Sequence, residues 1–133
     1  MIGIDTNVLL RLLTEDDAAQ AAAVQRLLAP LDAVPEAVLI NDIVLVETLW
    51  TLRHLYGFDR AGQADVLGHL LSAVTFRFED REVLSHALKA FTESPADFSD
   101  CLIAAKNTCW GCESTATFDR SMASLAGVTV LKA

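Results

Sequence analysis

The chain opens with MIGIDTNVLLRLL, residues 1–13, in which a short apolar run is followed by a polar corner and a helical pattern. Residues 1–4 are expected to form a buried strand that ends at Asp5. Residues 6–13 carry leucines at helical spacing. A strand that leads directly into a helix is the repeating unit of parallel α/β folds. This stretch therefore predicts an α/β protein with Asp5 at the carboxyl end of the first strand.

The rest of the chain repeats the alternation of strands and helices. Further strands are expected at residues 38–40, 74–78, 115–118 and 128–131. Further helices are expected at residues 17–29, 42–56, 60–73, 81–91, 97–109 and 119–125. The pattern predicts a single domain over residues 1–133, a three-layer α/β/α fold with a central, mostly parallel sheet. Ligands bind beyond the carboxyl ends of such strands, so we expect Asp5 and Asp119 at the same edge.

Composition limits the classes of function that the chain can serve. Of its 133 residues, 53% are apolar, enough for a real core, and its net charge is −8. That charge argues against a protein that coats nucleic acid with a broad basic face, although a small acidic site filled with cations could accept a phosphate. No apolar run approaches the roughly 20 residues of a membrane span, and a strand at Met1 leaves no room for a signal peptide. We therefore expect a soluble, cytoplasmic protein.

Three cysteines are present, at positions 101, 109 and 112. An odd number in a chain without a signal argues against a disulfide framework. Cys109 and Cys112 have the spacing of a redox pair or of half a zinc site, but the three histidines show no matching ligand spacing. The pair also closes a helix at Gly111, whereas a redox pair usually opens one. Reduced structural cysteines are the favoured interpretation.

Four acidic residues lie in or beside apolar stretches, where an unpaired carboxylate is costly to bury. They are Asp5, Glu47, Asp100 and Asp119. Each has a structural alternative: the aspartates could cap helices, and Glu47 could reach solvent or pair with an arginine. The helix at 42–56 is apolar nearly all round, so we expect it to be buried on every side, with Asp42 as its N-cap. Four such cases favour one shared explanation, a cluster that holds divalent cations.

The acids occur within four short motifs, namely Asp5-Thr6-Asn7, the Glu47 helix, DFSDCLIA at 97–104 and TFDR at 117–120. In order and spacing across the whole chain, these motifs resemble the PIN-domain ribonucleases, and most closely the toxin component of VapBC-type toxin–antitoxin pairs. The resemblance implies that Asp5, Glu47, Asp100 and Asp119 bind metal. It implies an additional acid at Asp97 and supporting polar roles for Thr6, Asn7 and Thr117. Cys101 departs from the pattern, where a small alanine is commoner.

The chemistry that the resemblance implies is metal-dependent hydrolysis of RNA, with 5′-phosphate and 3′-hydroxyl products. Mg²⁺ or Mn²⁺ suits an all-carboxylate site, because both prefer oxygen ligands. Such a cation polarises the scissile phosphate and activates water. The basic residues best placed to meet the RNA backbone are Arg11, Arg53, Lys106 and Arg120. The alternative for each is an ordinary surface cation.

The same residues disfavour two other functions and indicate protein partners. A magnesium phosphatase with an Asp-x-Asp motif is disfavoured because Asn7 cannot do acid–base work. A PIN-like binding module without catalysis is disfavoured because all four acids are present. Residues 43–56 and Leu9–Leu13 carry more apolar side chains than one sheet covers, which favours a homodimer and, by resemblance, an antitoxin that blocks the site. The alternative is a thick core.

Overall fold

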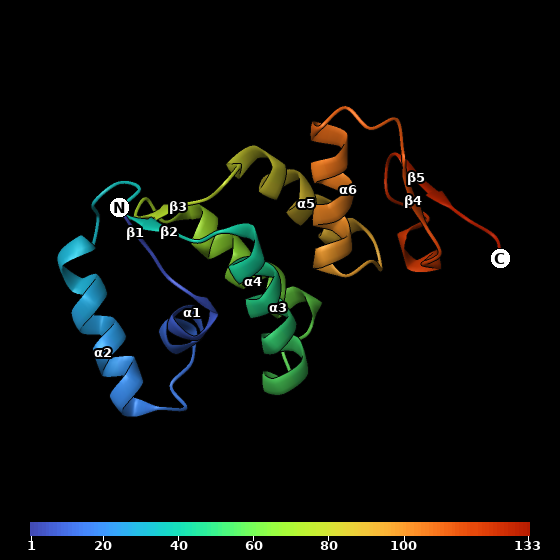
Figure 1. Ribbon diagram of the computed structural model, residues 1–133. Coiled ribbons are helices and arrows are strands. Elements are labelled where there is room, and N and C mark those ends of the chain that lie inside the picture. Colours follow the sequence, from blue (N-terminus) through green and yellow to red (C-terminus); the bar gives the residue numbers. More distant parts are fainter. The chain divides into compact units, whose positions relative to one another are not determined.

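A computed structural model describes all residues, 1–133, and the chain divides within it into two units. Unit 1 comprises Met1–Asp59 and His69–Glu79, and unit 2 comprises Arg60–Gly68 and Asp80–Ala133. Figure 1 shows the elements of both units along the chain. Helix α4 (Arg60–Ser72) contributes its first residues to unit 2 and its last to unit 1. The prediction of one domain over residues 1–133 stays a prediction.

The sheet of unit 1 is parallel and has three strands in the order β1-β2-β3. These strands are β1 (Ile2–Gly3), β2 (Val38–Leu39) and β3 (Phe76–Arg77). Ile2 pairs with Val38, and Val38 pairs with Phe76. The three strands predicted here are confirmed, although each is shorter than its apolar run.

The helices of unit 1 begin where short polar side chains accept a hydrogen bond from the first turn. Helix α1 (Thr6–Leu13) is capped by Asp5 and α2 (Ala18–Leu28) by Asp17, and a 3₁₀ turn, η1 (Ala29–Leu31), follows α2. Helix α3 (Asp42–Tyr56) is capped by Asn41, whose side chain accepts from the N–H of Val44. The prediction of Asp42 as this cap is wrong by one residue. Gly57 ends α3 in the left-handed conformation that glycine adopts most easily.

The core of unit 1 forms where α1 packs on α2 and α3. Leu9, Leu45 and Leu52 are completely buried there. The opposite side of α3 is open to solvent, with Ile43, Glu47 and Trp50 all exposed. The prediction that this helix is buried on every side is therefore wrong, because only one face of it meets the core.

Unit 2 is organised around α6 (Phe98–Cys109), which lies between α5 (Arg81–Glu93) and a pair of strands (Figure 1). The strands, β4 (Thr115–Thr117) and β5 (Val128–Val130), are parallel, with Thr117 opposite Val130. The predicted helix at 119–125 is reduced to one 3₁₀ turn, η2 (Arg120–Met122). The five predicted strands are thus all present, hydrogen-bonded as one sheet of three and one of two.

Arg60 holds the loop between α5 and α6. Its guanidinium lies 4.0 Å from the centre of the Phe91 ring and donates to the carbonyl oxygens of Phe91, Ser94 and Ala96 at 2.6, 2.7 and 2.8 Å. Carbonyls at a helix C-terminus have no partner within the helix, so a fixed cation satisfies them. The phenyl rings of Phe91 and Phe98 also meet edge to face. Arg60 therefore sets the path of the chain into α6.

Helix α6 ends in a Schellman motif. Gly111 has a φ of +88°, its N–H donates to the carbonyl of Thr108, and the N–H of Cys112 donates to the carbonyl of Asn107. The predicted helix end at Gly111 is confirmed. Cys109 and Cys112 are free and exposed, and Cys101 is free and buried. None of the helices in either unit combines the length and apolar content that a membrane crossing requires.

Candidate active site

Asp5 occupies the N-cap of α1. Its Oδ1 accepts a hydrogen bond from the N–H of Val8 at 3.0 Å, and the residue is exposed. The cap predicted as the structural alternative is therefore present. It uses one carboxylate oxygen, so it does not conflict with metal binding through the other. The metal role of Asp5 stays a prediction.

Thr6 connects the start of α1 to the middle of α3. Its hydroxyl donates to Oε1 of Glu47 at 2.9 Å, across 41 positions of sequence. Glu47 is exposed on the outer face of α3 and is not paired with an arginine in unit 1. The bond brings Glu47 next to the segment that carries Asp5, as a shared site requires. Asn7 is exposed in the first turn of α1, and its predicted orienting role stays a prediction.

In unit 2, Asp97 occupies the N-cap of α6. Its backbone carbonyl accepts from the N–H groups of Asp100 and Cys101, but its side chain makes no capping hydrogen bond. Asp97 is exposed, whereas Asp100, in the first helical turn, is half-buried. The carboxylate of Asp97 is therefore not used in holding the helix.

Asp100 and Asp119 interact directly, although 19 positions separate them in sequence. Burial, the charges of Asp119 and Asp97, and a hydrogen bond with Asp119 together raise the pKa of Asp100 above its ordinary value of 3.8. The pKa of Asp119 is lowered, chiefly by hydrogen bonds from Ser121 and also by one from Asp100. Burial and the neighbouring carboxylates therefore disfavour the charged form of Asp100, whereas the hydrogen bonds to Asp119 favour its charged form.

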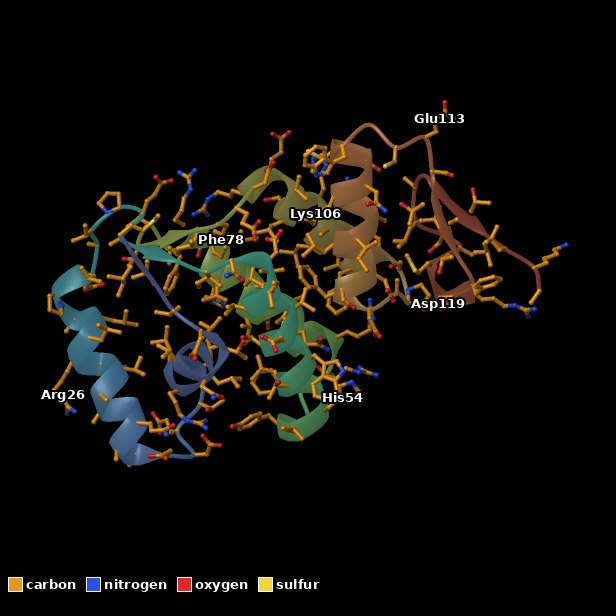
Figure 2. All side chains as sticks on the ribbon, in the orientation of Figure 1. Arg26, His54, Phe78, Lys106, Glu113 and Asp119 are labelled. Carbon is orange, nitrogen blue, oxygen red and sulfur yellow. The ribbon has the colours of Figure 1, made fainter.

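Asp119 is fixed at the turn that follows β4 (Figure 2). Its Oδ1 accepts from the N–H of Ser121 at 2.9 Å, and its own N–H donates to the hydroxyl oxygen of Thr117 at 3.0 Å. Thr117 thus has a supporting contact at the position where the resemblance implies one. Ser121 was not predicted. The signal for it was its place two residues after an acid at a helix start, a common capping spacing.

The expectation that the four acids are buried is wrong for three of them. Asp5, Glu47 and Asp119 are exposed, and only Asp100 is half-buried. Ile4, directly before Asp5, is buried, but Phe118, directly before Asp119, is exposed, and the three acids themselves lie at a strand end, on an outer helix face or at a turn. Among these acids, burial therefore raises the pKa of Asp100, and charge repulsion acts between Asp100 and Asp119.

The four basic residues predicted to meet RNA differ in their surroundings. Arg11 is already engaged: it donates to Asp16 at 2.6 Å, to Gln20 at 2.7 Å and to the hydroxyl of Tyr56 at 3.3 Å. The other three differ in how exposed they are. They are Arg53, exposed on α3, Lys106, half-buried on α6, and Arg120, exposed on η2.

Each unit supplies two of the four proposed ligands. Within either unit, no group of three His, Cys, Asp or Glu side chains is arranged to hold a metal ion. The donors are all carboxylate oxygens, which fits Mg²⁺ or Mn²⁺ and not zinc. The interaction of Asp100 with Asp119 fits as well, because a cation relieves the repulsion between two carboxylates. A full site requires the acids of both units, and their convergence stays a prediction.

Comparison with known proteins places these motifs in a family. The family model described as the PIN domain matches residues 2–128. A VapC ribonuclease from Aquifex aeolicus (strain VF5) is 24% identical over 127 residues, covering 96% of this chain and 93% of that protein.

Two solved structures are also similar over nearly the whole chain. Mycobacterium tuberculosis VapC20, described as a sarcin–ricin loop cleaving toxin, is 23% identical, with 98% of both chains covered and a TM-score of 0.43. A toxin–antitoxin complex from Klebsiella pneumoniae contains a chain with 18% identity, coverage of 97% and 95%, and a TM-score of 0.35. The family model spans nearly all residues and includes parts of both units. The chain therefore belongs to the PIN-domain family, which confirms the predicted three-layer α/β/α fold class with parallel strands.

Proposed function

We propose that the chain is a Mg²⁺- or Mn²⁺-dependent endoribonuclease that hydrolyses RNA phosphodiester bonds, and that it is the toxin of a type II toxin–antitoxin pair. The observation that carries the proposal is the Asp100–Asp119 pair, in which burial and the charges of Asp119 and Asp97 raise the pKa of Asp100. A position that concentrates negative charge is suited to a divalent cation. Family membership and the likeness to a VapC ribonuclease support the reaction class.

The proposed ligands are Asp5 and Glu47 from unit 1 and Asp100 and Asp119 from unit 2. A bound cation would supply Lewis acidity toward the phosphate and activate water as the nucleophile. The protein's contribution is to hold the oxygen donors in place. The start of α1 fixes Asp5, the Thr6 hydroxyl orients Glu47, and Thr117 and Ser121 fix the turn at Asp119. Supporting bonds of this kind tune a ligand's position and basicity.

The test is cleavage of RNA with Mn²⁺ and with EDTA, by the wild type and by Asp100→Asn. The wild type should cleave only with Mn²⁺, and the variant should be inactive although folded. Glu113→Gln is the matched control, because Glu113 is an exposed acid of unit 2 in the loop before β4 (Figure 2). Full metal-dependent activity in Asp100→Asn would refute the assignment. Wild-type protein that never cleaves RNA but still binds a protein partner would instead favour the binding-module alternative.

Binding of Mn²⁺ can be measured without any RNA. A ligand that binds only the folded state at about 100 times its Kd stabilises that state by about 2.7 kcal/mol. We expect Mn²⁺ to raise the Tm of the wild type and of Glu113→Gln, and to raise that of Asp100→Asn much less. An equal shift in Asp100→Asn would remove Asp100 from the ligand set, whatever the activity assay shows.

The same proposal includes an antitoxin as protein partner and a homodimer as the oligomeric state. Exposed apolar side chains on α3, at Ile43, Trp50 and Leu55, support a protein-binding surface. Co-expression with the small protein encoded beside this gene should yield a stable complex that suppresses cleavage. Light scattering of the isolated chain should give twice the mass of 14.4 kDa. A cytoplasmic location stays a prediction.

A further inference from the structure

A cavity of about 580 Å³ lies at one edge of the β4–β5 pair in unit 2. Its volume is within the range of small-ligand sites. Its lining residues follow the carboxyl ends of the two strands or lie within β5. They are Phe118, Arg120, Val130, Leu131, Lys132 and Ala133.

The parallel register brings these residues together. Thr117 pairs with Val130 at the ends of β4 and β5, and the N–H of Leu131 continues the pairing by donating to the carbonyl of Thr117 at 2.7 Å. The residues that follow the two strands therefore leave the sheet at the same edge. Asp119, one of the proposed metal ligands, lies in sequence between Phe118 and Arg120, two residues that line the cavity.

The ionisable side chains that line this cavity are basic, although the chain as a whole is acidic. The chain has 18 acidic and 10 basic side chains, yet the lining contains two basic side chains, Arg120 and Lys132, and no acidic side chain. Both cations are exposed, and neither is in an ion pair. Two uncommitted cations in an otherwise acidic protein favour an anionic ligand.

The aromatic ring in the same lining is unusually open. Phe118 is 68% exposed, although a phenylalanine at the end of a strand is ordinarily buried. Exposed aromatic rings beside cations are the means by which proteins bind single-stranded nucleic acid, with bases stacked on rings and phosphates held by Lys or Arg. Double-stranded RNA, whose bases are already stacked, would leave Phe118 unused.

From these observations we infer that Phe118, Arg120 and Lys132 form a subsite for one nucleotide of single-stranded RNA beside the cleaved bond. The base stacks on Phe118, and Arg120 and Lys132 contact the phosphate. The inference rests on the proposed ribonuclease function and extends it by naming the form of RNA and the residues that hold it. These residues are positioning residues, so they are expected to act on KM and not on kcat.

The test is steady-state cleavage of a labelled, unstructured RNA by the full chain in Mn²⁺ at several KCl concentrations. Phe118→Ala should raise KM about 10-fold, the effect of one lost base stack, with unchanged kcat and unchanged salt dependence. Phe118→Tyr should restore the wild-type KM. Lys132→Gln should raise KM and reduce the slope of log KM against log[KCl] by about 0.7, the value for one lost phosphate contact on a single strand.

Lys89→Gln is the matched control, because Lys89 is a lysine on α5 outside this cavity, and its KM and salt slope should equal those of the wild type. A salt slope in Lys132→Gln equal to that of the wild type would overturn the subsite. An unchanged KM in Phe118→Ala would also overturn the subsite. If that variant keeps the wild-type KM but loses a protein partner, the subsite is overturned as well. If Phe118→Ala and Lys132→Gln fail while the wild type cleaves RNA, the subsite is wrong and the proposed function stands. If the wild type cleaves no RNA, the proposed function fails and the subsite falls with it.

Discussion

In unit 1 each proposed ligand accepts a hydrogen bond from a nearby neutral donor, whereas in unit 2 the two proposed ligands also act on each other. Asp5 accepts from the N–H of Val8, and Glu47 accepts from the hydroxyl of Thr6. Burial and the charge of Asp119 raise the pKa of Asp100. The acids of unit 2 therefore carry a mutual repulsion that protonation or a cation relieves.

The difference suggests separate contributions to one site. Fixed donors set where Asp5 and Glu47 stand, with or without metal. The repulsion between the acids of unit 2 is relieved when a cation binds, so Asp100 and Asp119 should dominate the response to metal. Variants of residues in both units test this difference.

The largest expected effect is the loss of activity when Asp5 is changed. Asp5→Asn and Asp5→Ala should both lower RNA cleavage by more than about 100-fold, the upper range for losing a residue that merely supports a ligand. Asparagine also caps helices, so only Asp5→Ala should lower the free energy of unfolding, by about 1 kcal/mol. Urea denaturation of both variants separates the two roles. Equal stability losses would mean that the charge of Asp5, and not its cap, holds α1.

Arg60→Ala should produce the largest loss of stability. The change removes hydrogen bonds from a charged donor to three carbonyls and should lower the free energy of unfolding by about 2–3 kcal/mol. Arg60→Lys should recover part of this loss, because lysine cannot present the same planar fork. Arg26→Ala, on the exposed surface of α2 (Figure 2), is the control and should change almost nothing. A small effect at Arg60 would mean that the loop before Asp97 is held by packing alone.

A smaller effect, of opposite sign, is expected for Asp100→Asn in metal-free protein at neutral pH. The change removes one of two repelling charges and supplies an amide donor to Asp119. Because Asp100 is only half-buried, solvent screening limits the gain in the free energy of unfolding to a few tenths of a kcal/mol. Asp5→Asn should show no gain, since the charge of Asp5 is not opposed. Thermal unfolding in EDTA measures both variants, and a gain at Asp5 alone would reverse the contrast.

The smallest effect concerns a network of unit 1 away from the proposed ligands. Hydrogen bonds from Tyr56, first, and from Thr14, with the charge of Arg11, lower the pKa of Asp16 below 3.8. An acid whose pKa is lowered by folding stabilises the folded state at pH values above its ordinary pKa. This contribution is lost as the pH falls below 3.8 and through the lowered pKa. The difference in urea midpoint between wild type and Tyr56→Phe should therefore shrink in acid. A difference that stays constant with pH would show that Tyr56 acts through packing.

Much of the fold could be predicted from local sequence. The strand order along the chain, the caps at Asp5, Asp17 and Asp97, and the helix ends at Gly57 and Gly111 depend on residues within one turn. Burial could not be predicted in this way. Whether Glu47 faces the core depends on which side of α3 meets α1, and the apolar residues around it gave no single answer.

Contacts across many positions were also beyond the sequence. Arg60 binds backbone carbonyls, which every residue has, so no side-chain pattern in the sequence predicts these hydrogen bonds. The interaction of Asp100 with Asp119 depends on how α6 lies against β4. Asp42 and Asn41 are both good caps, and only the path of the backbone selects Asn41. The site residues were predicted through resemblance to a family, and their convergence stays a prediction.

The unequal burial of the three cysteines offers a way to observe the helix that carries Asp100. Cys109 and Cys112 are open to a thiol reagent, whereas Cys101, directly after Asp100, is 1% exposed and burial raises the pKa of its thiol. Two thiols should therefore be alkylated rapidly, and the third only when α6 opens. The alkylation rate of Cys101 therefore reports how often this helix opens locally. Cations that lower this rate can be ranked by affinity without RNA, a partner protein or any turnover.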